Sequence, residues 1–237
     1  MTTSLITGCS TGIGLATAVH LAAHGHTVYA SIRDEASGDA LLAAAAEAGA
    51  EVAVLSLDVN DPESIRDGVD HVLATAGGLD VLVNNAGVGD LSTVEETTDA
   101  GLLQMFQTNV FGPIAMIRAV LPTMRSAGSG TIVNVSSVSA RIVSALSGPY
   151  AATKYAMEAI TQAVAVEGSD SKVAAVFSDM ADYVWNLIGS DLGGPWVVAS
   201  NWVKHPFLCI LMRPQTNKHG GALTQDMFNL CEYPGER

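Results

Sequence analysis

The stretch Thr7-Gly8-Cys9-Ser10-Thr11-Gly12-Ile13-Gly14 stands between a short apolar run, residues 4–7, and an alanine-rich run that stops at Gly25. This order indicates a strand, a glycine-rich turn and a helix. Glycines at this spacing suit a tight turn, a close approach of the backbone to a phosphate group, and tight packing of the helix on the strand. The stretch therefore predicts a phosphate-binding turn of the dinucleotide type. A glycine-rich turn without a ligand is the alternative.

The helix that starts in this turn would point the N–H groups of its first turn at the phosphate. The hydroxyl groups of Ser10 and Thr11 can add further donors. We therefore expect several consecutive residues of the turn to contact the cofactor. They are Gly8, Ser10, Thr11, Gly12, Ile13 and Gly14.

Short apolar runs alternate with helical stretches along most of the chain. Near-continuous apolar strands separated by helices are typical of a parallel sheet that is covered on both faces. We therefore predict an α/β fold, a single domain with a doubly wound, Rossmann-type parallel sheet and helices on both faces. The expected strands are residues 4–7, 27–31, 51–57, 81–84, 131–136 and 172–177.

The chain of 237 residues carries 24 acidic and 11 basic residues, a net charge of −13. Nucleic acids and anionic membrane surfaces attract clustered Lys and Arg, so we expect neither as a partner. The chain opens without a secretory signal pattern and has no apolar run of about 20 residues, so we expect a cytoplasmic protein. The 3 cysteines and 6 histidines lack the spacing of metal ligands, and we predict no metal site.

The end of the second strand is where a dinucleotide-binding fold selects its cofactor. An acidic residue there would bind the ribose 2′-OH of NAD and repel the 2′-phosphate of NADP. This chain has the neutral Ser31 at that point and Arg33 two residues later. A guanidinium group binds phosphate through forked hydrogen bonds, so we expect NADP(H) to be favoured over NAD(H). The alternative is that Arg33 pairs with Asp34 or Glu35 at the surface.

Tyr150 and Lys154 stand four residues apart in a segment rich in helix formers. On a helix this spacing puts the phenol and the ammonium group on one face. A cation within a few Å lowers the pKa of a tyrosine because it favours the phenolate. Such a phenol can donate or accept a proton near neutral pH. The pattern predicts an acid-base pair, and a chance pairing of exposed side chains is the alternative.

Further motifs precede Tyr150 in a fixed order: the glycine-rich turn, Asn84-Asn85-Ala86-Gly87, Asn109 and Ser136-Ser137. Together with Tyr150 and Lys154, these motifs resemble those of the single-domain short-chain dehydrogenase/reductase family over residues 3–177. The resemblance implies a nicotinamide cofactor and a small-molecule carbonyl or alcohol substrate. It also implies a homodimer or homotetramer that assembles through the helices carrying Asn109 and Tyr150.

The resemblance implies a catalytic set of Asn109, Ser137, Tyr150 and Lys154. Ser137 would donate a hydrogen bond to the substrate carbonyl beside Tyr150, and Lys154 would also bind the nicotinamide ribose. Asn109 would distort its helix so that a backbone carbonyl holds a water in a proton path to Lys154. The locally unfavourable Gly112-Pro113 close by fits such a distortion, with a simple helix kink as the alternative.

Two further segments would line the adenosine side of the cofactor. Asp58-Val59 follows the third strand, where the family places an aspartate near the adenine amino group; the alternative is that Asp58 only forms a turn. Asn85, Ala86 and Gly87 would both support the sheet and contact the cofactor. Tyr150 and Lys154 complete the expected cofactor contacts.

The resemblance fades after residue 177. The family's Pro-Gly turn and a following threonine, which touch the nicotinamide, are replaced by Ser178-Asp179-Met180, and the next threonine is Thr216. All three tryptophans fall within residues 185–202, which fits an aromatic substrate lid or a subunit contact. We expect residues 178–237 to form a divergent lid, a last strand and a tail of the same domain. An altered reading frame or a fusion near residue 168 is the alternative.

These observations predict an NADP-dependent oxidoreductase that interconverts a ketone or aldehyde and an alcohol by hydride transfer, with Tyr150 as general acid and base. The segment between Ser137 and Tyr150 contains Ile142, Val143 and Leu146, so we expect an apolar substrate. The missing Pro-Gly turn motivates an alternative, a dinucleotide-binding pseudoenzyme or assembly protein with an impaired nicotinamide half-site. The complete catalytic set argues against that alternative, because a binding module has no use for a tuned phenol.

Overall fold

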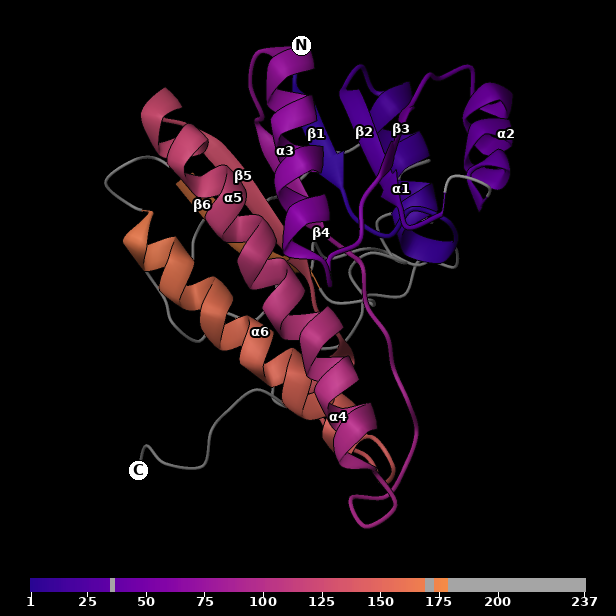
Figure 1. Cartoon of the computed structure of the whole chain (residues 1–237), viewed down its shortest axis with the longest axis vertical. Coiled ribbons are helices and arrows are strands. Elements are labelled where there is room, and N and C mark those ends of the chain that lie inside the picture. The colour runs from indigo at the N-terminus through magenta and orange to yellow at the C-terminus, as the bar shows by residue number, and fades with distance from the viewer. Residues whose placement is uncertain (35–36, 169–172, 179–237) are drawn as a thin grey trace, which may run out of the picture. The chain divides into compact units, whose positions relative to one another are not determined.

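The computed structural model of the chain describes residues 1–34, 37–168 and 173–178, which form a parallel sheet and its covering helices (Figure 1). Each predicted strand is present, with its ends shifted by no more than two residues. The strands are β1 (Thr3–Ile6), β2 (Thr27–Ile32), β3 (Ala53–Ser56), β4 (Val81–Asn84), β5 (Gly130–Val135) and β6 (Val173–Ser178). The helices are α1 (Gly12–Ala23), α2 (Asp39–Glu47), α3 (Pro62–Ala76), α4 (Asp99–Phe106), α5 (Gly112–Ala127) and α6 (Gly148–Glu167), with the π-helix η2 (Gln107–Phe111) and the 3-10 helix η3 (Val138–Ala140).

The strands are all parallel and follow the order β3-β2-β1-β4-β5-β6. Because β1 pairs with both β2 and β4, the direction of winding reverses between β1 and β4. In open α/β sheets a crevice forms at the carboxyl ends of the strands at this point, and ligands bind in it. The predicted doubly wound, Rossmann-type fold is confirmed.

Helices cover both faces of the sheet. Successive residues of a strand point to opposite faces, and accordingly Leu5 and Ile6 of β1 belong to two different apolar clusters, as do Leu82 and Val83 of β4. The cluster of Leu5 and Leu82 includes side chains of α3, α5 and α6. The cluster of Ile6 and Val83 includes side chains of α1 and α2. The alternation of core residues in the strands therefore fixes which helices lie on which face.

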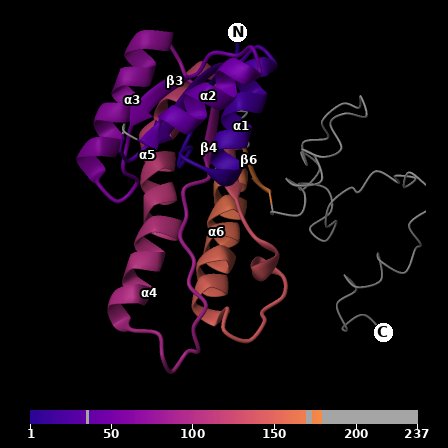
Figure 2. The ribbon, with the colours of Figure 1, turned by 90° about the vertical axis from the view of Figure 1, so that its right-hand side faces the viewer.

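The helical region predicted over about residues 99–124 is present, and α4, η2 and α5 follow one another without a break. Figures 1 and 2 show these three helices as one long rod beside α6. The π-helix η2 in the middle of the rod contains Asn109, where the sequence predicted a distortion. Insertions of this kind are rare and often lie at functional sites.

The turn after β1 is held by the end of β4. Gly8 has a φ of +72°, and a Cβ atom on it would lie 2.8 Å from Ala86 Cα. The Asn85 side chain donates to the carbonyls of Thr7 (2.9 Å) and Gly8 (3.0 Å). The Thr7 hydroxyl accepts the backbone N–H groups of Asn85 (3.1 Å) and Ala86 (3.0 Å). Gly8 and Asn85 thus join the two strands that flank the crevice.

No helix in the described part of the chain combines the length and the apolar character that a membrane crossing requires. The described residues all lie within Met1–Leu192, the first of the two units into which the chain divides. The predicted lid, last strand and tail, with the three tryptophans, lie outside the described residues except for Ser178.

Two glycine substitutions test the close approach of β1 and β4. Both Gly8 (φ +72°) and Gly12 (φ +59°) have a left-handed backbone, but a Cβ on Gly12 would meet no atom within 4 Å. Gly12→Ala should therefore cost only the left-handed strain, about 1 to 2 kcal/mol. Gly8→Ala should cost roughly 1 to 3 kcal/mol more, because its methyl group overlaps the backbone of Ala86. Urea unfolding measures both, and equal losses would contradict the close approach.

Candidate active site

Tyr150 and Lys154 lie on the first turns of α6, with Pro149 in the helix's first turn. The Lys154 Nζ atom lies 5.7 Å from the centre of the Tyr150 ring, so the predicted pairing of phenol and ammonium is present in space. Lys154 is 7% exposed, and its Nζ donates to the Val135 carbonyl at the end of β5 at 2.8 Å. The pair therefore faces the carboxyl edge of the sheet, where ligands bind in this class of fold.

Burial lowers the pKa of Lys154 to about 8, because removal from water disfavours the charged form. The loop after β4 borders the same two side chains. A Cβ atom on Gly89 would lie 3.4 Å from Tyr150 Cδ2, and one on Gly87 would lie 3.9 Å from Lys154 Nζ. A methyl group at either position would be in ordinary van der Waals contact with the acid-base pair, so the loop lies directly beside it.

Asn109 joins this loop to α6. Its Oδ1 accepts the Val88 N–H at 2.8 Å, and its Nδ2 donates to the Val88 carbonyl at 2.7 Å and to Thr153 Oγ1 at 3.1 Å. Asn109 is 2% exposed. Gly112, just after η2, allows the helical rod to approach Val59, since a Cβ there would lie 2.8 Å from the Val59 carbonyl oxygen. The π-helix therefore turns one amide side chain toward two segments of the site, the loop after β4 and α6, while the proton path itself stays a prediction.

Ser136 and Ser137 end β5 and have different partners. Ser136 Oγ donates to Glu158 Oε1 of α6 at 2.9 Å. Ser137 Oγ accepts the Ser139 N–H at 3.2 Å and so caps η3. Both side chains are buried, at 4% exposure. Because Ser136 is committed to a carboxylate, Ser137 is the hydroxyl that keeps its proton available for another acceptor.

Sequence reasoning missed two buried residues of α6, Thr153 and Glu158. Thr153 Oγ1 donates to the Tyr150 carbonyl at 2.7 Å and accepts from Asn109, so it connects η2 with the turn of helix that carries Tyr150. Glu158 stands four residues after Lys154 and is 5% exposed. The sequence did contain a signal for Glu158, because its spacing of four residues from Lys154 puts it on the helix face of Tyr150 and Lys154. Charged residues are rarely buried without a partner, so a carboxylate on a buried face predicts a polar contact.

The predicted phosphate-binding turn lies at the N-terminus of α1. Thr11 is the N-cap residue, but its own side chain makes no capping hydrogen bond, and the first turn has no acidic residue. Ser10 is half-buried, whereas Thr11 and Gly12 are exposed. Exposed residues at the positive end of a helix are accessible to an anion, which is consistent with the predicted phosphate-binding turn. Asn85 was expected both to support the sheet and to contact the cofactor. The described bonds of its side chain hold the turn after β1, and contact with the cofactor stays a prediction.

The residues expected to select the cofactor occupy unlike environments. Ser31 lies inside β2 and is 1% exposed, and its hydroxyl has no hydrogen-bond partner among the described residues. The strand ends one residue later, at Ile32, so the position at the strand end is apolar. Arg33 follows and is exposed. Arg33 is thus the predicted residue that can reach a ligand. The alternative, a surface pairing of Arg33 with Asp34 or Glu35, stays open, and Glu35 lies outside the described residues.

Asp58 and Val59 form part of a turn after β3. The Asp58 carboxylate accepts the Asn60 N–H at 2.9 Å, and the Asp58 N–H donates to Ser64 Oγ at 2.9 Å. Val59 is 6% exposed. These contacts support a turn-forming role for Asp58, and contact with the adenine stays a prediction.

A model of the short chain dehydrogenase family matches residues 2–178. The chain is similar to 3-ketodihydrosphingosine reductase of Bacteroides thetaiotaomicron, with 37% identity over 163 residues, 69% of this chain and 57% of that protein. It resembles the structure of a metagenomic short-chain oxidoreductase in complex with NADP (TM-score 0.71, 30% identity, 75% of this chain and 81% of that one). It also resembles NAD+-bound xylitol dehydrogenase (TM-score 0.71, 27% identity, 74% and 68%).

The matched region ends where the described part of the chain ends, at residue 178. The chain spans little more than half the length of the first curated relatives that it matches, at 57%, 54% and 53%. Fold, site geometry and the family model agree over the same residues. The chain therefore belongs to the short-chain dehydrogenase family.

Proposed function

We propose that the chain is an NADP(H)-dependent oxidoreductase that interconverts an apolar ketone or aldehyde and the corresponding alcohol. The observation that carries this proposal is the buried Lys154 ammonium beside the Tyr150 ring, at the carboxyl edge of a doubly wound sheet. In a chance pairing of an exposed tyrosine and an exposed lysine, the ammonium group would stay in water. Groups with a shifted pKa gather at catalytic sites, because proton transfer near neutral pH requires them.

In this proposal each member of the site has one task. NADPH, when bound, supplies the hydride that reaches the carbonyl carbon. Tyr150 donates its proton to the carbonyl oxygen in reduction and takes it back in oxidation. Lys154 stabilises the negative charge left on the phenol oxygen, and Ser137 donates a hydrogen bond to the carbonyl oxygen. Asn109 holds the loop after β4 against α6 and so keeps the acid-base pair in place.

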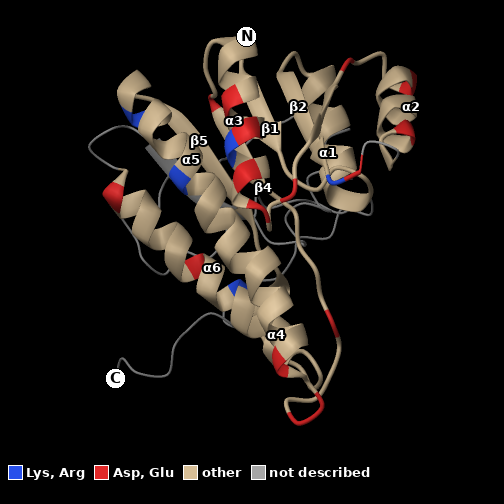
Figure 3. Cartoon of the chain, in the orientation of Figure 1, with Lys and Arg blue, Asp and Glu red and all other residues tan. Residues whose placement is uncertain are grey.

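The preference for NADP(H) rests on Arg33. It is exposed just after β2, where the buried, neutral Ser31 and Ile32 offer no carboxylate to a ribose hydroxyl. Basic residues are sparse in the described chain, whereas acidic ones gather on α2 and α3 (Figure 3). A guanidinium at this position therefore supports binding of a 2′-phosphate. The similar metagenomic oxidoreductase carries NADP, whereas xylitol dehydrogenase carries NAD+.

Two apolar loops support an apolar substrate. Leu91 and Val94, after β4, are 74% and 80% exposed, and Ile142 and Leu146, after η3, are 71% and 46% exposed. The Ser92 N–H donates to the Leu146 carbonyl at 2.9 Å, so the two loops form one rim. Leu146 has a φ of +67°, a strained backbone for a branched residue. An exposed apolar rim beside the acid-base pair suits a substrate with a hydrocarbon body.

Exposed apolar residues on the rod of α4 and η2 support the homodimer or homotetramer. Leu103 is 63% exposed and Phe111 is 47% exposed. Aromatic and large aliphatic side chains are enriched where subunits meet. We therefore propose that this rod and α6 contribute to contacts between copies of the chain.

Replacing Tyr150 tests the acid-base assignment. Tyr150→Phe removes the proton donor and should lower the turnover number by about 10²- to 10⁴-fold, while the Kd for NADPH changes by less than about twofold. Tyr155→Phe is the matched control, because Tyr155 is an exposed tyrosine of the same helix, and it should leave turnover unchanged. The assay follows NADPH oxidation with cyclopentanone, 2-decanone and benzaldehyde as probes. Full activity of Tyr150→Phe would contradict the role of Tyr150 as general acid and base.

Replacing Arg33 tests the cofactor preference. Arg33→Ala should weaken NADPH binding by about 10- to 100-fold through loss of a charge-assisted hydrogen bond, and should leave NADH binding unchanged. Arg66→Ala is the control, since Arg66 is exposed on α3 and pairs with Asp67. Nicotinamide fluorescence reports both affinities. An equal loss for the two nucleotides, or no loss, would rule out recognition of the 2′-phosphate by Arg33.

The pH dependence of stability tests the buried cation. The pKa of Lys154 in the folded chain, about 8, lies below its ordinary value of 10.5, so the unfolded chain binds more protons between these pH values. Lys154 therefore destabilises the fold below about pH 8, and this cost is relieved as the pH rises. Relative to Lys154→Met, the wild-type chain should gain roughly 2 kcal/mol between pH 7 and pH 10. If the free energies of unfolding of the two chains change equally between pH 7 and pH 10, the ammonium group is hydrated and the lowered pKa is contradicted.

A further inference from the structure

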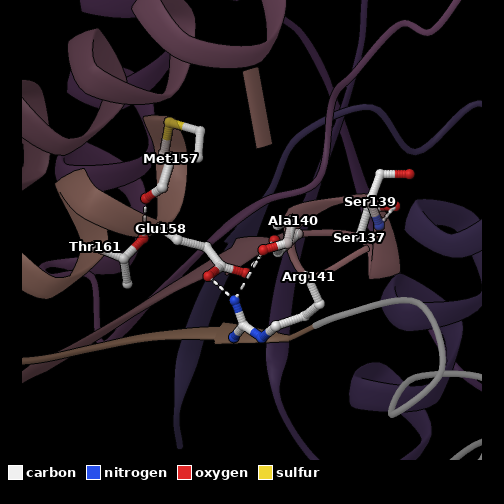
Figure 4. Close-up of polar contacts among 8 residues, drawn as sticks. Ser137, Ser139, Ala140, Arg141, Met157, Glu158 and Thr161 are labelled. Carbon is white, nitrogen blue, oxygen red and sulfur yellow. Dashed lines mark hydrogen bonds and ion pairs between the residues drawn. The ribbon is translucent and has the colours of Figure 1, made fainter. Parts of the chain in front are cut away.

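Glu158 is the one described carboxylate buried in α6 near the acid-base pair, and the proposed reaction does not use it. It follows Tyr150 and Lys154 at steps of four residues, so the three side chains share one helix face over about 12 Å. Both carboxylate oxygens are engaged. Oε1 accepts Ser136 Oγ at 2.9 Å, and Oε2 accepts Arg141 Nη1 (Figure 4).

The two partners of Glu158 enclose Ser137. Ser136 directly precedes it, and Arg141 follows it at the end of η3. Figure 4 shows that the Arg141 guanidinium contacts both the Glu158 carboxylate and the Ala140 carbonyl, to which it donates at 3.2 Å. Residues 136–141 are therefore attached at both ends to one carboxylate. The Lys154 bond to the Val135 carbonyl adds a third attachment just before this segment.

We propose that Glu158 is a positioning residue that acts through Ser136 and Arg141 to fix the Ser137 hydroxyl relative to Tyr150. The inference rests on the proposed function, since it concerns the geometry of that reaction. The carboxylate comes from the same helix as Tyr150, so the helix that carries the proton donor also holds the turn that carries the second hydroxyl. Catalytic groups must be held to a fraction of an Å, and a misplacement of about 1 Å can cost about 100-fold in rate.

A buried Arg-Glu pair that only stabilises the fold is the competing explanation. Removing one partner would not separate the two, because a lone buried charge destabilises any fold. Replacing both partners with Met removes the charges together and keeps apolar bulk, a change that is often neutral for stability. The double variant Arg141→Met/Glu158→Met therefore removes the attachment without leaving an unpaired charge. Arg66→Met/Asp67→Met, at the exposed ion pair of α3, is the matched control.

The test is a kinetic cycle with the same three carbonyl probes and NADPH. The double variant should lower the turnover number by about 10- to 100-fold, change the Kd for NADPH by less than about twofold, and keep a thermal midpoint close to that of the wild type. Starting from Ser137→Ala, the same double change should lower turnover by no more than about twofold, because the hydroxyl that it positions is already gone. The α3 control should change none of these values.

Ser136→Ala serves as a second route that keeps both charges. It removes one of the two attachments and should lower turnover by about three- to tenfold in the wild-type chain and not at all in Ser137→Ala. Wild-type turnover in the double variant overturns the positioning role, and so does an equal loss with and without the Ser137 hydroxyl. Either result leaves the proposed function intact. Absence of any NADPH-dependent turnover by the wild-type chain contradicts the proposed function itself, and the positioning role falls with it.

Discussion

Burial of the Lys154 ammonium group is the constraint on which the arrangement of the site depends. Among the described residues its hydrogen bond goes to the Val135 carbonyl and not to a carboxylate. Glu158, one turn further along α6, is occupied by Ser136 and Arg141. A buried charge without an opposite charge loses its hydration uncompensated, and this loss lowers the pKa of Lys154. The Lys154 ammonium group and the Glu158 carboxylate, which could have formed an ion pair, are engaged with other partners, which leaves Lys154 as a buried cation with a lowered pKa.

Directional polar contacts hold the elements around this cation. Asn84 of β4 donates to Asn134 of β5 at 2.8 Å, and Asn134 donates to Thr161 of α6 at 2.8 Å. Asn109 adds the bonds from η2 to Val88 and Thr153. Buried amides of this kind tolerate few alternative geometries, because an unmet hydrogen bond in the interior is costly. The strand ends and α6 are therefore set in place by specific pairs as well as by apolar packing.

The sequence predicted the architecture because the alternation of apolar runs and the glycine-rich turn are local patterns. It did not predict the partners of Ser136 and Thr153, since helix periodicity tells which residues share a face and not what lies opposite. Ser31 illustrates a second limit. The neutral side chain of Ser31 indicated that no carboxylate is present to bind a ribose hydroxyl. Only the structure shows that this hydroxyl is buried and that the strand continues to Ile32. The distortion at Asn109 was expected from the family resemblance and from the nearby Gly112-Pro113. Its form, a π-helix, and the bonds of Asn109 to Val88 and Thr153 could not be predicted from local sequence.

The proposed function requires that a hydride passes between NADPH and a carbonyl carbon held beside Tyr150. The most direct measurement is to supply NADPH that is doubly deuterated at C4 of the nicotinamide, together with cyclopentanone, and to analyse the product by mass spectrometry. Hydride transfer from this NADPH gives cyclopentanol with one deuterium on the carbon that bears the hydroxyl group. Cyclopentanol without deuterium, or no reduction of this or the other carbonyl probes, would contradict it.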